Sequence, residues 1–311
     1  MSMGTIKVES RVVLVAGDAH PRLAEVVALS ARLDFLQASV SAFADGESRV
    51  KIDADIQDAD VYILQPTFTP TNERLMTLAL MADAAKGAGA ARVTAVMPYF
   101  GYARQDVVQG RGEPHSARLA ARLLRAAGVD RAVVMELHSP ALESAFDIRL
   151  VHLRADDILL PAVRQWGMMD LTIVSPDAGG LKRAQRYASL LDVPVAVVAK
   201  TRPAPDMISA LHVLGDVRDR SCLVVDDMSS TGGTLARAAH ALMRAGARQV
   251  HGLFVHAVLA PGALECIRDS PLRRILTTDS VPVATGVPMQ VVSTAPVLAA
   301  AIKRLAGMTE E

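Results

Sequence analysis

The 311-residue sequence has little aromatic character, little cysteine and no net charge. Phe, Trp and Tyr make up 4% of it, and 33 basic residues balance 33 acidic ones. Without a positive field, no general attraction to nucleic acid or an anionic membrane is expected. Cys222 and Cys266 stand far apart, which argues against a disulfide framework or a zinc site. No signal-peptide pattern or membrane-spanning apolar run is present, so we expect a cytoplasmic protein.

The hydrophobic residues, 51% of the chain, fall mostly into short apolar runs that alternate with segments of helical periodicity. This order predicts an α/β fold in which mainly parallel sheets are flanked by helices. The length fits two domains, and we place their boundary near residues 152–157. The predicted domains are an N-terminal domain over residues 1–153 and a C-terminal domain over 154–296. Residues 297–311 are predicted to form a C-terminal helix and tail, for which we consider packing on the N-terminal domain.

The apolar runs and the periodic segments give specific boundaries for the expected elements. Strands are predicted at Val12–Ala16, Val61–Gln65, Arg92–Met97, Ala132–Glu136, Leu171–Ser175, Val195–Ala199, Ser221–Val225 and Val250–His256. Helices are predicted at Pro21–Leu33, Asn72–Lys86, Ser116–Ala127, Gly180–Leu191, Thr234–Ala245 and Ala295–Ala306. Met207–Leu214 is expected to form an antiparallel hairpin or edge strand.

The most informative segment runs from Leu223 to Thr234. An apolar strand ends in Asp226 and Asp227, passes through small hydroxyl residues and two glycines, and opens into a helix. The backbone N–H groups and the positive dipole end of such a helix attract phosphate. The two carboxylates add acceptors for vicinal hydroxyl groups, so the segment indicates a ribose 5-phosphate. The alternative is that the carboxylates only cap the helix.

Two further segments are candidates for binding a nucleotide. The sequence PYFGYARQD at residues 98–106 places aromatic rings beside Arg104, whose guanidinium suits bidentate contact with phosphate. Alternatively, these rings only cover the end of a sheet. In the segment Phe43 to Glu47, a purine could stack on the ring while carboxylates accept its exocyclic amine. An Asp-Gly pair is also an ordinary turn signal.

Three polar segments follow predicted strands, where open α/β sheets bind their ligands. Asp177 offers a hard oxygen ligand for Mg²⁺, although it also suits capping of the next helix. His138 reaches a strand end, where packing or exposure without a ligand is the common alternative. Lys200 and Arg202 begin an irregular stretch that could close over a transferring phosphoryl group, or form a solvated basic turn.

Taken together, these segments resemble the ribose-phosphate pyrophosphokinases, which synthesise phosphoribosyl pyrophosphate. PYFGYARQD, SPDAGG at 175–180, LGDVRDR at 214–220 and VVDDMSSTGGT at 224–234 carry the resemblance, which extends from about residue 43 to 282. It implies two tandem phosphoribosyltransferase type I-like domains. It also implies an enzyme, a ribose-phosphate diphosphokinase, that transfers the β,γ-diphosphoryl group of ATP to the C1 hydroxyl of ribose 5-phosphate and releases AMP.

The resemblance also implies roles for positions of this chain. Lys200 and Arg202 are implied to be catalytic, and His138 and Asp177 to bind Mg²⁺. The implied ATP-binding residues are Phe43, Asp45, Glu47, Arg104, Gln105 and His138. The implied ribose-5-phosphate-binding residues are Asp177, Asp226, Asp227, Ser230, Thr231, Gly232, Gly233 and Thr234.

The resemblance further implies a homo-oligomer in which the Phe43 loop completes the adenine site of a neighbouring subunit. Dimer, tetramer and hexamer stay open. The alternatives are a non-catalytic synthetase-like regulatory subunit and, less favoured, a phosphoribosyltransferase. Glu136, Ser139–Phe146 and Val107–Gly112 depart from the family pattern, and the last lacks most of the basic residues that the resemblance implies for a phosphate and nucleotide regulatory site. Regulation by phosphate or ADP is therefore left open.

Overall fold

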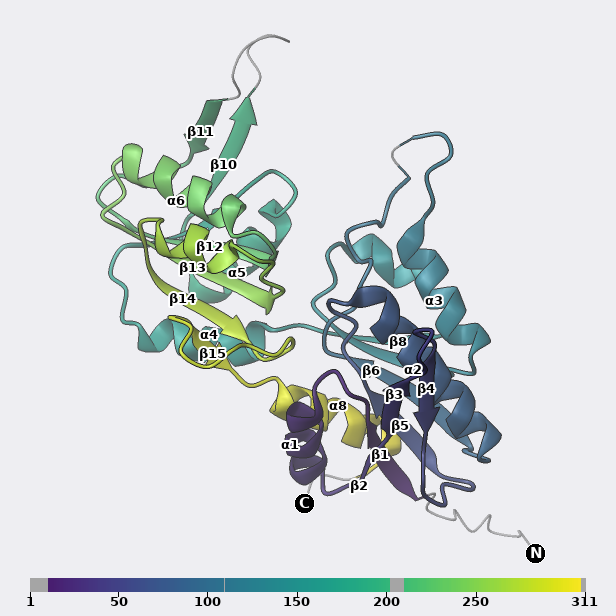
Figure 1. Cartoon of the computed structure of the whole chain (residues 1–311). Helices are drawn as coiled ribbons and strands as arrows, with labels where there is room; N and C mark the ends of the chain where they lie inside the picture. Colours follow the sequence, from purple (N-terminus) through teal and green to yellow (C-terminus); the bar gives the residue numbers. More distant parts are fainter. Residues whose placement is uncertain (1–10, 109, 202–209, 309–311) are drawn as a thin grey trace, which may run out of the picture. The chain divides into compact units, whose positions relative to one another are not determined.

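The computed structural model describes residues 11–108, 110–201 and 210–308, which form two compact units (Figure 1). The first unit combines the chain up to Leu153 with the segment from Ala295 onward, and the second contains Arg154–Thr294. Within the described ranges, no helix is long and apolar enough to cross a lipid bilayer.

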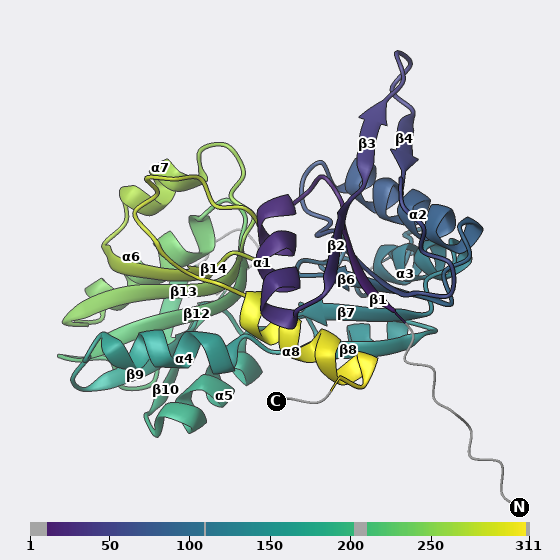
Figure 2. The ribbon, with the colours of Figure 1, turned by 90° about the horizontal axis from the view of Figure 1, so that it is seen from below.

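The first unit is built on a six-stranded parallel sheet. Its strands are β1 (Val12–Ala16), β2 (Asp34–Gln37), β5 (Asp60–Leu64), β6 (Arg92–Met97), β7 (Arg131–Met135) and β8 (Arg149–Leu153), in the order β2-β1-β5-β6-β7-β8. Its helices are α1 (Pro21–Ala31), α2 (Thr71–Gly87), α3 (Ser116–Ala126), the 3-10 helix η1 (Pro140–Ala145) and α8 (Ala295–Ala306). The strands β3 (Ser39–Ala42) and β4 (Ser48–Lys51) form a separate antiparallel hairpin (Figure 2).

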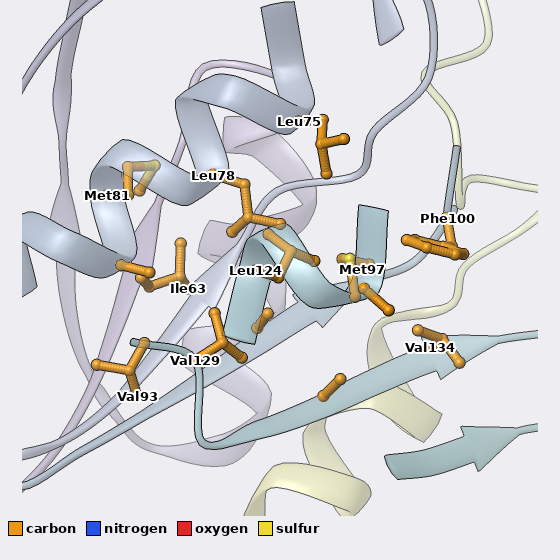
Figure 3. Close-up of a cluster of buried hydrophobic side chains, with 14 of the residues drawn as sticks. Ile63, Leu75, Leu78, Met81, Val93, Met97, Phe100, Leu124, Val129 and Val134 are labelled. Atoms are coloured by element: carbon orange, nitrogen blue, oxygen red, sulfur yellow. The ribbon is translucent and has the colours of Figure 1, made fainter. Parts of the chain in front are cut away.

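Every residue of β5 and β7 is buried, because helices cover both faces of a parallel sheet. Figure 3 shows the packing on one face, where Leu78 and Met81 of α2 and Leu124 of α3 lie over Ile63 and Met97 of the sheet. These side chains make the core that the continuous apolar runs of the sequence predict.

The second unit is built on a seven-stranded sheet. Its strands are β9 (Leu171–Ser175), β10 (Val195–Thr201), β11 (Ala210–Leu214), β12 (Ser221–Ser229), β13 (Gln249–Ala257), β14 (Leu272–Thr278) and β15 (Gln290–Val292), in the order β11-β10-β9-β12-β13-β14-β15. Only the pairing of β10 with β11 is antiparallel. The helices are α4 (Asp156–Gln165), α5 (Leu181–Leu191), α6 (Gly233–Arg244) and α7 (Ala263–Arg268).

The predicted fold class, with two domains of parallel sheet and flanking helices, is confirmed. One strand boundary was wrong in a way that matters for function. β12 continues to Ser229, since its pairing with β13 extends through Asp226↔Phe254 to Ser229↔Ala257. Asp226 and Asp227 therefore lie within the strand, and the loop that precedes α6 is shorter than predicted. Of the predicted edge strand, residues 207–209 lie outside the described residues.

A buried ion pair connects the sheet of the first unit to α8, which packs against α1 (Figure 2). Nη2 of Arg131 lies 2.9 Å from both carboxylate oxygens of Asp60 and 3.0 Å from the Tyr62 hydroxyl. Nη1 of Arg131 donates to the backbone carbonyl of Leu305 in α8 at 3.2 Å. Burial and the neighbouring Asp60 carboxylate raise the pKa of Tyr62 to about 12, so the phenol stays protonated.

Replacing Arg131 by Met should destabilise the first unit, because Asp60 would be left buried without its main counter-ion. We expect the free energy of opening of β5 and β7 to fall by about 3–5 kcal/mol, measured by native-state hydrogen exchange. Arg92→Met is the matched control, since Arg92 pairs with the same carboxylate at 3.2 Å but its side chain is 49% exposed. That variant should lose at most about 1 kcal/mol. Equal losses in the two variants would contradict the assigned role of burial.

Candidate active site

The candidate site of the second unit lies at the carboxyl edge of its sheet, meaning the edge at which the parallel strands end. The loop after β9 contains Asp177, and the loop after β12 contains Ser230 and Thr231. Because β9 and β12 are parallel neighbours, these loops follow adjacent strands on the same edge. The topology therefore brings together the residues that the sequence predicted for a ribose 5-phosphate.

Two adjacent carboxylates on β12 are held by one arginine from α5. Nη1 of Arg183 lies 3.7 Å from Oδ1 of Asp226 and 3.4 Å from Oδ1 of Asp227. The Asp226 side chain is 18% exposed, and the Asp227 and Arg183 side chains are more deeply buried. Sequence reasoning missed Arg183. Its position near the start of the helix after SPDAGG was the available signal, but a basic residue there is common on a helix surface.

The environment of the carboxylate pair changes its protonation. Burial, followed by the charge of Asp227, raises the pKa of Asp226 to about 8, and the Arg183 guanidinium opposes this shift. One proton is thus retained on the pair near neutral pH in the protein without ligand. A ligand that places hydroxyl groups or positive charge beside the pair would favour its full ionisation.

A tight turn joins β12 to α6. Gly232 has φ 75°, and a Cβ at this position would lie 2.8 Å from the carbonyl oxygen of Ala263. Glycine is therefore required there both by conformation and by space. Gly233 already belongs to α6, so of the two glycines only Gly232 adopts a positive φ. The N–H groups of the first helical turn lack intrahelical partners and can bind an anion.

Asp177 caps the helix that follows it. Its Oδ1 accepts a hydrogen bond from the backbone N–H of Gly180 at 2.9 Å, and its backbone carbonyl accepts one from the Ser175 hydroxyl at 2.7 Å. The carboxylate is nevertheless exposed. The capping role considered from the sequence is therefore present, and it leaves the group accessible to a ligand.

In the first unit, most of the aromatic residues of segment 98–106 are structural. Tyr99 and Phe100 are buried, and Phe100 packs against Phe146 with ring centroids 5.1 Å apart. The Tyr102 hydroxyl donates a hydrogen bond to Asn72 in α2. These rings cover the end of the sheet, which was the alternative to nucleotide binding that the sequence left open.

The two polar residues that end this segment differ in their surroundings. Arg104 is exposed and has no ion-pair partner among the residues that the structure describes. Gln105 accepts a hydrogen bond from the Ser116 hydroxyl at 2.5 Å, and its backbone carbonyl accepts one from Ala117 at 3.3 Å. Gln105 thus fixes the start of α3, whereas Arg104 is available for an anionic ligand.

His138 lies exposed in the loop after β7, and a second histidine fixes the loop. Glu136 adopts φ 40°, and the backbone N–H of Leu137 donates to Nε2 of His152 at 3.0 Å. Nδ1 of His152 must then carry the proton, which it donates to Glu143 at 2.7 Å. Sequence reasoning missed this His152–Glu143 pair, because the two residues meet only through the packing of η1 against β8.

The segment Phe43 to Glu47 is the turn of the β3–β4 hairpin (Figure 2). The backbone N–H of Phe43 donates to the Glu47 carbonyl at 2.8 Å, and the N–H of Glu47 donates to Oδ1 of Asp45 at 3.2 Å. The Phe43 side chain is 51% exposed, with the Arg49 guanidinium 5.8 Å from its ring centroid. The segment is a regular turn, and its ring remains free to stack on a ligand.

The two predicted catalytic cations can be placed only in part. The backbone of Lys200 belongs to β10, whereas its side chain and the whole of Arg202 lie outside the described residues. Among the described residues, no group of three or more His, Cys, Asp or Glu side chains is arranged to hold a metal ion.

The fold of the second unit and its β12–α6 loop are those of a phosphoribosyl transferase domain. Residues 147–282 match the phosphoribosyl transferase domain, and residues 12–128 match the N-terminal domain of ribose phosphate pyrophosphokinase. The chain belongs to the ribose-phosphate pyrophosphokinase family.

Known relatives match almost the whole chain. It is 41% identical to the ribose-phosphate pyrophosphokinase of Gloeobacter violaceus, over 88% of this chain and 83% of the relative. It is 40% identical to that of Ralstonia nicotianae, with 93% of each covered. The crystal structure of phosphoribosylpyrophosphate synthetase from Mycobacterium smegmatis is similar, with a TM-score of 0.90, 35% identity, and coverage of 96% of this chain and 100% of that chain.

The raised pKa of Asp226 predicts a pH-dependent stability of the second unit. Its ordinary pKa is about 4, so between about pH 4 and 8 the folded chain keeps a proton that the unfolded chain has lost. This stabilising contribution is present at low pH and decreases as the pH rises through that window. Asp226→Asn removes this pH dependence, so the thermal midpoint of the variant minus that of the original protein should increase by a few degrees as the pH rises from 5 to 8.

The measurement can use the fluorescence of Trp166, the only tryptophan of the chain, which lies in the second unit. Asp192→Asn is the matched control, because Asp192 is an exposed carboxylate of the same unit. Its pH profile should parallel that of the original protein. Parallel profiles for Asp226→Asn as well would contradict the proposed protonation.

Proposed function

We propose that this chain transfers the β,γ-diphosphoryl group of ATP to the C1 hydroxyl of ribose 5-phosphate and releases phosphoribosyl pyrophosphate and AMP. The observation that carries the proposal is the pair Asp226–Asp227 beside the turn at Gly232 that begins α6. Carboxylates suit the ribose hydroxyls, and the helix N-terminus suits the 5-phosphate. The family match supplies the same activity.

The second unit binds and orients the sugar phosphate. Asp226 and Asp227 accept hydrogen bonds from the ribose hydroxyls. The positive charge of Arg183 reduces the repulsion between the two carboxylates. Backbone N–H groups after Gly232, with the side chains of Ser230, Thr231 and Thr234, surround the 5-phosphate. This arrangement presents the C1 hydroxyl for in-line attack on the β-phosphorus, so catalysis depends mainly on positioning.

The first unit binds ATP. Arg104 contacts the phosphates, since it is exposed and without an acidic partner in the described ranges. His138 lies beside them in the loop that His152 fixes. Phe43 stacks on the adenine, with Asp45 and Glu47 near the exocyclic amine and Gln105 supporting the site. In a homo-oligomer, the hairpin of one subunit would provide this stacking to its neighbour.

Lys200 and Arg202 are proposed to stabilise the charge on the transferring group and on the leaving AMP phosphate. Asp177 in the second unit, whose carboxylate is exposed, and His138 in the first unit are each proposed as a ligand of a Mg²⁺ ion that takes most of its oxygen ligands from substrates and water. When bound, this ion would neutralise phosphate charge. A cytoplasmic location agrees with these metabolite substrates.

The direct test incubates purified protein with ATP, Mg²⁺ and ribose 5-phosphate, with and without inorganic phosphate, and follows products by mass spectrometry. AMP and phosphoribosyl pyrophosphate should form in equal amounts. Lys200→Ala and Arg202→Ala should each lower turnover by about 10²-fold or more, as expected for lost transition-state charge stabilisation. Folded protein that binds ATP but forms no AMP would instead support a regulatory subunit. Near-normal turnover of both variants would reject their assigned roles.

Arg183 is proposed as a positioning residue for the carboxylate pair. Arg183→Gln should raise KM for ribose 5-phosphate by about tenfold or more, because a charge-assisted contact is worth about 1.5–3 kcal/mol. KM for ATP should change little, and Arg183→Lys should restore part of the effect. Lys182→Gln, an exposed neighbour in α5, is the control and should behave like the original protein. Parallel increases in both KM values would indicate a general structural effect instead.

A further inference from the structure

A cavity of about 610 Å³ lies at the amino edge of the second sheet, opposite the candidate active site. The end of α4, β14 and β15 lie together there (Figure 1). The cavity has the size of a small-molecule site. Its wall is aromatic and basic, and includes Trp166, Arg248, Gln249, His251, Arg273 and Arg274.

The strand register shows that this cavity is separate from the ribose-phosphate loop. His251 near the start of β13 pairs with Leu223, whereas Ala257 at its end pairs with Ser229. Six residues of extended strand span about 20 Å. The cavity is therefore reached from the amino edge of the sheet, whereas the ribose-phosphate loop lies at the carboxyl edge. The function proposed above does not use the cavity.

The positive charge of the wall is only partly balanced. Arg248 pairs with Asp170 at 3.2 Å and donates to the carbonyl of Met169 at 2.8 Å, so it is held in place. Arg273 donates to Gln249 at 2.9 Å. Among the described residues, no carboxylate pairs with Arg273 or Arg274, and both are exposed. Two neighbouring guanidinium groups thus face the cavity without counter-ions.

Several contacts hold the aromatic part of the wall in place. Trp166 donates from Nε1 to Gln290 at 2.8 Å, and its ring centroid lies 5.4 Å from that of His251. The Arg274 guanidinium lies 5.7 Å from the Trp166 ring centroid. A second cavity, of about 380 Å³, is also lined by Trp166, Arg273 and Arg274, so these three residues separate the two cavities.

His251 is a polar group without a partner in this wall. The residue is 3% exposed, and neither ring nitrogen has a hydrogen-bond partner among the described residues. Burial, Arg274 and Arg273 lower its pKa to about 4, so the ring is neutral at physiological pH. A neutral imidazole can donate one hydrogen bond and accept one. A ligand that reaches the ring would supply a partner that the described residues do not.

We propose that the cavity lined by Trp166, His251, Arg273 and Arg274 binds a small anion with two or more phosphate groups. Each guanidinium group can donate paired hydrogen bonds to one phosphate, so two adjacent guanidinium groups match two neighbouring phosphates. A ligand with a single carboxylate would occupy only one of them. The volume of the cavity also accommodates a nucleoside attached to the phosphate groups. The shared chemistry is the oligophosphate, whether it is inorganic or part of a nucleotide.

The test uses the full-length protein and the fluorescence of Trp166, the only tryptophan in the sequence. Inorganic triphosphate, ADP and uncharged adenosine are titrated separately. A saturable change with triphosphate and with ADP, but not with adenosine, is expected. A response to triphosphate alone identifies an inorganic oligophosphate site, and a response to ADP alone identifies a nucleotide site. No saturable response to either phosphate compound overturns the proposal.

Matched variants locate the response. Arg273→Gln and Arg274→Gln should each raise the apparent Kd at least about tenfold, whereas Arg244→Gln, which removes an exposed charge at the end of α6, should leave it within twofold. Equal weakening in all three variants would show nonspecific attraction and reject the site. A changed oligomeric state in the first two variants, with no anion response in the original protein, would show that the cavity is a subunit contact instead.

Activity separates this proposal from the preceding one. Without added oligophosphate beyond the substrates, Arg274→Gln should form phosphoribosyl pyrophosphate at a rate within twofold of the original protein. Asp226→Asn should keep the fluorescence response to triphosphate even where synthesis fails. Loss of the response in Asp226→Asn, with retention in Arg274→Gln, would assign the signal to the carboxyl edge and overturn the second site.

Discussion

Parallel pairing of the strands is the constraint on which both units depend. It directs all strands of the first sheet, and all strands of the second except β11, toward the same edge, so the loops that follow these strands gather there whatever their distance in sequence. In the second unit, this brings the loop with Asp177 beside the turn at Gly232. In the first unit, β6 and β7 are parallel neighbours, so the segments with Arg104 and His138 follow adjacent strands. The sheets need continuous apolar burial, while the loops remain free to carry polar chemistry.

The carboxylate pair shows how the fold accommodates two buried acidic groups whose ionisation destabilises it. Asp226 and Asp227 are adjacent and largely buried, a placement that favours protonation over charge. Arg183 opposes that tendency from the first turn of α5. The same helix begins at the cap formed by Asp177. The connection between β9 and α5 and the first turn of that helix therefore provide both an exposed carboxylate and the cation that pairs with Asp226 and Asp227, so the geometry of the proposed site depends on the packing of α5.

Sequence patterns predicted what depends on neighbours along the chain. The apolar runs identified β1, β6 and β9 with their observed bounds, and the local order around Gly232 predicted the turn that begins α6. Features that depend on contacts across the fold were not predicted. Arg183 acquires its role only because α5 lies against β12, and His152 only because η1 brings Glu143 to β8. The length of β12 was underestimated for the same reason, since pairing with β13 outweighs the low strand preference of aspartate.

The two edges of the second sheet place polar groups by different physical means. At the carboxyl edge, a turn with positive φ exposes backbone N–H groups, so an anion can be held with few cationic side chains. At the amino edge, the cavity beside β13 and β14 is lined by side chains instead, and its positive character comes from Arg273 and Arg274. Like charges that lie side by side without counter-ions do not stabilise a fold, and Trp166 compensates only in part through its ring face. A phosphorylated ligand would complete the balance of charge that this edge lacks.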